Sequence, residues 1–152
     1  MGNYVKFSLT PGEQNDLRRY VPDDVVRTIW SDASDDDEIV SEVESVIVDI
    51  EAEVDSRLAR KYNVPFQDPV PPVVIQISTV LVAEAVFMRS NGANDIVSDA
   101  AEAKRSMLES ILNGDIVIAG ATVSSDESAA PPTSRVIRGG EDRLMYRESL
   151  EF

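Results

Sequence analysis

Carboxylates are the abundant groups in this sequence that could do chemistry. The chain of 152 residues contains 28 Asp and Glu residues but no Cys and no His. The missing residue types exclude disulfides, cysteine nucleophiles, serine–histidine pairs and the usual zinc ligands. What remains is acid–base work by paired carboxylates, or a Mg²⁺ or Ca²⁺ site built from carboxylate oxygens.

The densest group of acids is Asp35-Asp36-Asp37-Glu38. It lacks the glycine turn and the downstream glutamate that a calcium loop requires. Ser34, directly before it, is a residue type that caps helices, and acids in a first helical turn complement the helix dipole. We therefore expect a helix start and a solvated face here. The sequence predicts no catalytic residue, no metal and no cofactor.

Glu84 interrupts the most apolar stretch, Val73 to Met88. An acid in such a place lines a pocket, pairs with a base or lies at a subunit contact, and the last two are the commoner reasons. The stretch falls short of the roughly 20 residues that cross a bilayer. We expect a buried core helix and no contact with a membrane. The first ten residues show no export signal.

The spacing of apolar residues predicts a mainly α fold. From Ile39 to Leu58 they recur at steps of three and four, which indicates an amphipathic helix over residues 34–61. Pro71 and Pro72 open a helix that ends at Arg89 and is apolar on nearly every side, as expected for the centre of a bundle. Further helices are predicted within 21–30 and from 95 to 113.

The remainder of the chain is predicted to be non-helical. Residues 115–124 are a strand candidate, and residues 124–134 have the composition of a flexible linker. We therefore expect a small bundle of three to four helices over residues 1–114. Residues 115–152 would add a short C-terminal β element, the linker and an extended tail.

Cations and aromatic residues gather at the end of the long predicted helix. They form a subunit contact or a helix-end motif made of Asp55, Arg57, Arg60, Lys61, Tyr62, Pro65 and Phe66. Cations suit the negative end of a helix, and Pro65 stops it. Asp55 is expected to join an ion pair or a cap. Tyr62 and Phe66 either cover the helix end or lie between subunits.

The C-terminal tail keeps apolar and arginine side chains that are unusual in a frayed end. Arginine is favoured at interfaces, and disordered tails usually lack this density of apolar residues. The alternative is a disordered remnant. We predict that the tail orders on a partner through Arg135, Val136, Ile137, Arg138, Arg143, Leu144, Met145, Tyr146, Arg147, Leu150 and Phe152.

Charge is divided unevenly along the chain, whose net charge is −14. Residues 34–70 hold 11 acids and 3 bases, whereas residues 131–152 hold 4 of each. Such a field repels phosphates, so we do not expect tight duplex binding by the whole surface. Candidates for one continuous acidic face are Asp35, Asp36, Asp37, Glu38, Glu42, Glu44, Asp49 and Glu51.

The order Asp55-Ser56-x-Leu58-Ala59-x-x-Tyr62-x-Val64-Pro65-Phe66, with Val70-Pro71-Pro72 opening an apolar helix, is similar to the core pattern of a known family. It resembles the Mu-like phage family of small neck proteins, called head-completion or head-tail adaptor proteins. The family's arginine before tyrosine falls on Lys61, with Arg60 one place earlier. The resemblance covers about residues 18 to 116.

The resemblance implies a structural virion protein of the phage neck, assembled in the cytoplasm of the bacterial host, and no enzyme. Copies would form a homo-oligomeric ring, a dodecamer of about twelve chains, below the portal protein. The ring would extend the DNA channel and contact the next neck or tail protein. We expect the acidic face to line the channel, where DNA passes without specific binding, and the tail to dock into the portal.

Two other classes of function stay open. An acidic DNA mimic would inhibit a nucleic-acid-binding partner, such as a basic nuclease or repressor, by presenting carboxylates spaced like backbone phosphates. It would do so without a portal. An enzyme with a carboxylate metal site would bind Mg²⁺, Mn²⁺ or Ca²⁺ tightly and stoichiometrically.

Overall fold

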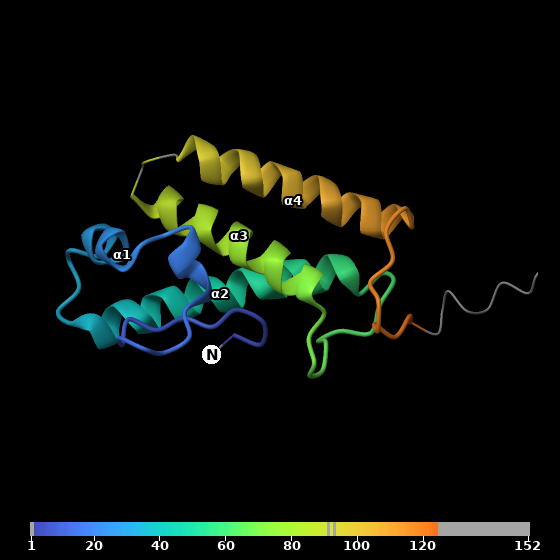
Figure 1. Ribbon diagram of the computed structural model, residues 1–152, viewed down its shortest axis with the longest axis horizontal. Helices are drawn as coiled ribbons and strands as arrows, with labels where there is room; N and C mark the ends of the chain where they lie inside the picture. The colour runs from blue at the N-terminus through green and yellow to red at the C-terminus, as the bar shows by residue number, and fades with distance from the viewer. Residues whose placement is uncertain (1, 91, 93, 125–152) are drawn as a thin grey trace, which may run out of the picture.

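The computed structural model describes residues 2–90, 92 and 94–124. Within them the chain forms a 3₁₀ turn η1 (Asp16–Arg19) and the helices α1 (Asp23–Ile29), α2 (Asp36–Leu58), α3 (Pro72–Arg89) and α4 (Asp95–Asn113). The prediction of a mainly helical domain is confirmed. Figure 1 shows α3 between α2 and α4, with α1 and the N-terminal segment packed along one side.

Helix α2 begins two residues later and ends three residues earlier than the sequence predicted. Its N-cap is Asp35 instead of Ser34, because the Asp35 carboxylate accepts the N–H of Glu38 at 2.9 Å. Ser34 instead donates its N–H and its hydroxyl to Glu38 Oε2, both at 2.7 Å. The predicted apolar stripe is buried at Ile39, Val43, Ile47, Val54 and Leu58.

Helix α3 is the central helix, as its apolar sequence indicated. It packs against α2 and α4, and also against α1 and η1. With 18 residues and a mean hydropathy of 1.5, it has the minimum length and composition of a membrane span, which the sequence reading did not expect. More than half of it is buried by its neighbours, so the same apolar residues are accounted for as core.

Helix α4 is bounded by clear signals at both ends. The Asn94 side chain accepts the N–H groups of Ile96 and Val97, and Gly114 ends the helix in the left-handed region at φ 89°. The buried stripe starts at Val97 and continues through Ala101, Leu108 and Ile111. Ile96 is 81% exposed because it lies one position before that stripe.

The predicted strand over residues 115–124 is wrong for the described residues. One antiparallel bridge, Tyr62 to Val123, replaces it, with Asn63 N–H donating to Thr122 O at 2.9 Å and Ser124 N–H to Lys61 O at 3.0 Å. The pairing stays short because Pro65 follows within two residues and has no N–H for a ladder. Ile118 turns inward instead and is buried.

The N-terminal segment, residues 2–9, belongs to the core although no helix or strand is predicted there. Tyr4, Val5 and Leu9 are buried against the helices. Gly2 lies so close to α2 that a methyl group on it would come within 2.7 Å of Glu51 Oε1 and closer still to Ile47. Position 2 therefore has no room for a side chain.

Candidate functional site

A buried carboxylate on α2 fixes the N-terminal segment. Glu51 is 3% exposed and accepts three backbone N–H groups, from Asn3 at 2.5 Å, Tyr4 at 2.9 Å and Val5 at 2.8 Å. Hydrogen bonds to an ionised acceptor are among the stronger ones in proteins. The prediction that Glu51 belongs to the exposed acidic face is therefore wrong, because its side chain points into the chain's own interior.

The sequence held a signal for this position that the acidic composition obscured. Glu51 stands four residues after Ile47 and three before Val54, which places it on the apolar stripe of α2. An acid at such a position needs a buried partner. The N-terminal N–H groups supply it, but no local pattern identifies them, because the contact joins residues 46 to 48 positions apart.

Tyr4 connects this carboxylate to the end of α2. Its hydroxyl donates to Asp55 Oδ1 at 2.5 Å and accepts the N–H of Phe66 at 3.0 Å. Burial and the hydrogen bond to Asp55 raise the pKa of Tyr4. Burial also raises the pKa of Asp55, with a further contribution from negative Glu51, while the Tyr4 hydroxyl opposes the rise. The expected partners of Asp55, an arginine or the helix end, are replaced by a tyrosine.

The aromatic residues after α2 close the end of the core. Tyr62 and Phe66 are buried, with their ring centroids 6.3 Å apart, and Phe66 lies 6.1 Å from the Tyr4 ring. The Tyr62 hydroxyl accepts the N–H of Ile118 at 3.2 Å. Tyr62 and Phe66 therefore cover the end of α2 within the chain, one of the two alternatives expected for them. Pro65 and Arg60 remain exposed at the same end of the molecule.

The cations of this motif bind α4 as well as their own helix. Arg57 pairs with Glu53 at 2.8 Å, in i, i+4 spacing along α2, and lies 3.6 Å from Glu109 of α4. Lys61 Nζ donates to the carbonyl of Ile111 at 3.2 Å, in the last turn of α4. The cation expected at the negative end of α2 thus serves the negative end of a different helix.

The remaining acidic candidates lie along α2 in different surroundings. Asp36 pairs with Arg27 at 2.8 Å and Glu42 with Arg89 at 3.1 Å, in exposed ion pairs. The hydrogen bond from Arg27 lowers the pKa of Asp36, and the bonds from Ser34 lower that of Glu38. Asp35 caps the helix. Asp37 and Asp49 are exposed, whereas Glu44 is half-buried.

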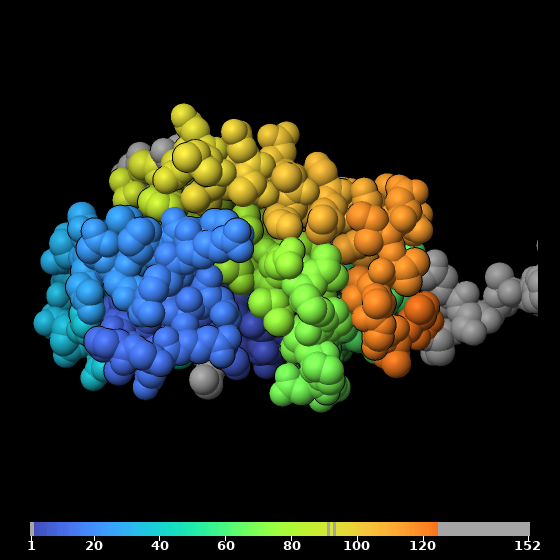
Figure 2. Space-filling model, viewed as in Figure 1, coloured from blue at the N-terminus to red at the C-terminus, as the bar shows by residue number. Residues whose placement is uncertain are grey.

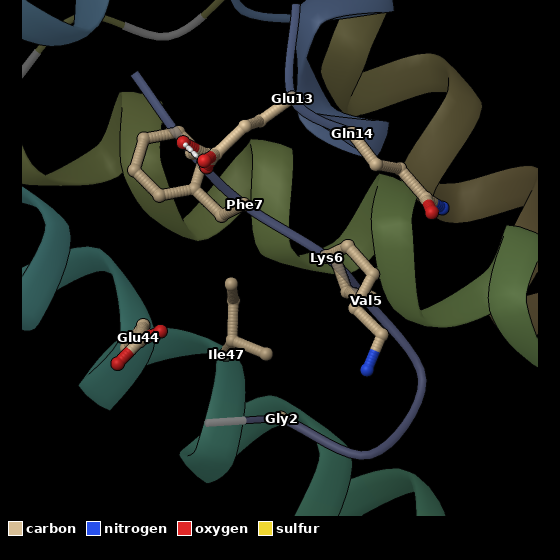
Figure 3. Close-up of a pocket in the computed structure, with 9 residues that line it drawn as sticks. Gly2, Val5, Lys6, Phe7, Glu13, Gln14, Glu44 and Ile47 are labelled. Atoms are coloured by element: carbon tan, nitrogen blue, oxygen red, sulfur yellow. Dashed lines mark hydrogen bonds between the residues drawn. The ribbon is translucent and has the colours of Figure 1, made fainter. Parts of the chain in front are cut away.

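Glu44 borders a hollow between the N-terminal segment and α2, of about 290 Å³. Figure 3 shows Lys6, Glu13 and Glu44 around it, with Phe7 and Ile47 as apolar walls. Glu13 is held by the hydroxyl of Ser8 at 2.7 Å. The two carboxylates that line the hollow, Glu13 and Glu44, come from separate parts of the chain. Within the described part of the chain, no three acids gather in a way that could hold a metal ion.

Glu84 pairs with a base, one of the alternatives that the sequence left open. Arg105 of α4 donates to Glu84 Oε1 at 3.2 Å and makes a shorter bond to Oε2. The pair lies in a groove of about 120 Å³ between α2 and α4, which Leu81 and Met88 of α3 also line. The hydrogen bond raises the pKa of Arg105. Glu84 therefore joins α3 to α4.

Residues 12–136 match the protein family described as Bacteriophage Mu, Gp36. The chain belongs to this family. The resemblance found in the sequence covers about residues 18 to 116. The Gp36 match is longer at both ends, and it includes the linker and the first residues of the tail. No curated protein and no solved structure matched the chain.

Membership in the Gp36 family makes this a phage protein and indicates a structural or morphogenetic role in the virion. The tail residues predicted to dock on a partner, 135–152, lie outside the described residues. The helix-end motif and the acidic helix lie within both the described part and the match.

Proposed function

We propose that this Gp36-family chain is a head-tail connector. Copies of it form a ring below the portal, extend the channel for DNA and present a surface to the next neck or tail protein. The observation that carries the proposal is the outward face of α2, on which exposed acids are held along one rigid helix. Family membership supports the phage context.

The geometry of α2 suits a channel wall. Its 23 residues give a rod of about 35 Å. The buried stripe fixes the rod against α3, so Asp37, Glu38, Glu42 and Asp49 face outward together with small polar residues. Binding to DNA needs cations that replace the counterions of phosphate. An acidic wall lacks them, and DNA can slide past it.

Two ion pairs moderate this negative charge. Arg27 and Arg89 lie against Asp36 and Glu42, and Arg89 also stacks 4.9 Å from the Trp30 ring. Both arginines are thereby held by the chain's own carboxylates, so neither is presented as a separate phosphate-binding cation. Glu51 is buried and cannot belong to the acidic wall. The residues proposed to form this wall are Asp35, Asp36, Asp37, Glu38, Glu42, Glu44 and Asp49.

The connector is proposed to work without catalysis, metal or cofactor. About twelve copies, the number that the resemblance to phage neck proteins implies, close the ring through one repeated contact. Exposed Arg60 and Pro65 contribute to contacts at the helix end, and the distal tail, Arg143 to Phe152, docks into the portal. The ring is proposed to assemble in the host cytoplasm and to remain in the neck of the virion.

Native mass spectrometry of the full chain, alone and mixed with its portal protein, tests the proposal. A ring bound to the portal is expected, and a reconstruction of that complex should show α2 lining the channel. Deletion of residues 131–152 should abolish portal binding and leave the helical domain folded. A chain that stays monomeric with the portal, or a ring with a basic wall, contradicts the connector. Tight binding to a basic nuclease or repressor without any portal would favour the DNA-mimic class instead.

A further inference from the structure

A groove lies at the end of the molecule where the described chain stops. It encloses about 670 Å³ between the proline-rich loop 63–72 and residues 119–122. Figures 1 and 2 show these two segments side by side, the loop in green and residues 119–122 in orange. The lining is mostly apolar, from Val64, Pro65, Phe66, Pro69, Val70 and Ala121, and Asp68 is its charged residue.

Apolar side chains continue beyond the groove in the segment that leads to Ser124. Val117 is 71% exposed and Val123 is 48% exposed. Because Thr122 O and Ser124 N–H face the bridge to residues 61–63, alternation along an extended chain directs the N–H and C=O of Val123 to the other side. No group among the described residues bonds to either of them. An extended peptide could therefore pair with this edge.

The tail of the chain carries positively charged side chains, whereas residues 1–124 have an excess of acids. Residues 1–124 hold 22 of the 28 acids and only 10 of the 14 bases. The four remaining bases are all arginines, and the first two flank a pair of β-branched residues in Arg135-Val136-Ile137-Arg138. Such a segment favours extended structure and matches an apolar groove in an acidic domain.

The distance along the chain favours a neighbour's groove over the chain's own. The extended spacer between Ser124 and Arg135 reaches about 36 Å. A compact domain of this size has a diameter of about 35 Å, so the spacer spans to an adjacent copy. The chain's own groove is formed by the residues directly before Ser124. Binding there would leave most of the spacer looped out, whereas an adjacent copy uses its length.

We propose that the segment Arg135–Arg138 of one copy binds in the groove of the next copy. Val136 and Ile137 cover the apolar lining, and a flanking arginine faces Asp68. The contact is heterologous, so repeating it around one axis closes a ring when the rotation between copies divides a full turn evenly. The inference rests on the proposed function only in requiring copies side by side, and it leaves the distal tail, from Arg143 onward, for the portal.

Because the chain has no cysteine, engineered disulfides give a direct test. One full-length variant carries Ala121→Cys in the groove, and a second carries Ile137→Cys in the tail. The two are co-expressed and oxidised mildly, alone and with the portal protein. The expected product is a covalent dimer of one groove variant and one tail variant. The matched control replaces Ala121→Cys by Ala103→Cys, an exposed position on α4, and should give at least tenfold less dimer.

A double variant, Ala121→Cys with Ile137→Cys, separates the two possible sources of the tail. At high dilution it should give no internal disulfide, and within rings it should give covalent ladders. An internal disulfide in the diluted monomer overturns the inference. Rings that form without the groove–tail disulfide also overturn it and leave the connector standing. Conversely, disulfide-linked copies that never bind the portal support this contact and count against the connector.

Discussion

The hydroxyl of Tyr4 lies 2.5 Å from Asp55 Oδ1, to which it donates a hydrogen bond across 51 positions of sequence. The Tyr4 hydroxyl oxygen also accepts the N–H of Phe66 at 3.0 Å. One phenol therefore joins the N-terminal segment, the last turn of α2 and the proline-rich loop. The groove proposed to receive a neighbour's tail is partly built on that loop, so the hydroxyl has a role in holding its shape.

Replacing Tyr4→Phe should destabilise the protein by about 1–3 kcal/mol, because the buried N–H of Phe66 loses its acceptor. The ring contact with Phe66 stays, so the loss reports the hydroxyl. Urea unfolding followed by circular dichroism measures it. Tyr20→Phe is the matched control, since Tyr20 is half-buried and its hydroxyl makes no hydrogen bond within the described residues. Equal effects of the two substitutions would show that the hydrogen bonds of the Tyr4 hydroxyl add nothing to the free energy of unfolding.

Glu51→Gln should release the N-terminal segment. The carboxylate accepts N–H groups with both oxygens, whereas an amide offers one oxygen and turns a donor toward the other N–H. We expect a loss of about 1–3 kcal/mol, with faster amide hydrogen exchange at Asn3, Tyr4 and Val5. Glu53→Gln, on the exposed side of the same helix, should leave the exchange rates of these three amides unchanged. Slow exchange in Glu51→Gln would mean that packing alone holds the segment.

The helices were predictable because each carries its own local signals. Proline at the start of α3, Gly114 after α4 and the apolar stripe from Ile39 to Leu58 all lie within the segment that they define. The pairing of Glu84 could be expected from its apolar surroundings, but its partner Arg105 could not, because 21 residues separate them. Helical periodicity predicts that an acid is buried, but it does not identify the group that binds its carboxylate.

The errors of sequence reasoning share a physical cause. Residues 115–124 have strand composition, but a strand also needs a partner with free N–H groups, and Pro65 limits the partner here. Glu51 resembles its acidic neighbours in composition, but its position on the apolar stripe of α2 buries it. The N-terminal segment was missed because its backbone donors bind a residue on α2 that only the folded chain brings near.

The stability conferred by Asp55 should decrease as the pH rises above the ordinary pKa of an aspartate, about 3.9. Burial raises the pKa of Asp55 in the folded chain, so the folded state holds this proton more tightly than the unfolded state does. Its contribution is complete below the unfolded pKa and is lost as the pH passes the folded pKa. The difference in unfolding free energy between the native protein and Asp55→Asn, measured in urea from pH 3 to pH 7, should therefore fall with pH. A flat or rising difference contradicts the assignment.

The Glu84–Arg105 pair should couple more strongly than an exposed pair of the same chain. The side chain of Glu84 is 11% exposed and that of Arg105 is 48% exposed. A double-mutant cycle with Glu84→Gln and Arg105→Met should give a coupling energy of about 1 kcal/mol, discounted for the exposed arginine. The comparison cycle, Glu53→Gln with Arg57→Met, should give about 0.3–0.5 kcal/mol. Equal couplings would show that burial of Glu84 adds nothing to the pair.

Reversing charge on the outward face of α2 should make the proposed channel hold DNA. Ser45 and Asp49 are exposed one turn apart on this helix, so Ser45→Lys with Asp49→Lys adds three positive charges per copy. Lysines facing phosphate release counterions, which creates affinity that weakens with salt.

The matched variant, Asp99→Lys with Ala103→Lys, adds the same charge at the same spacing to exposed positions of α4. Both variants should fold and bind the portal. Only the α2 variant should retain duplex DNA in the assembled ring at low salt and reduce the fraction of particles that form plaques. Because the two variants have the same net charge, an equal loss in both would assign the effect to overall charge and would remove α2 from the channel wall.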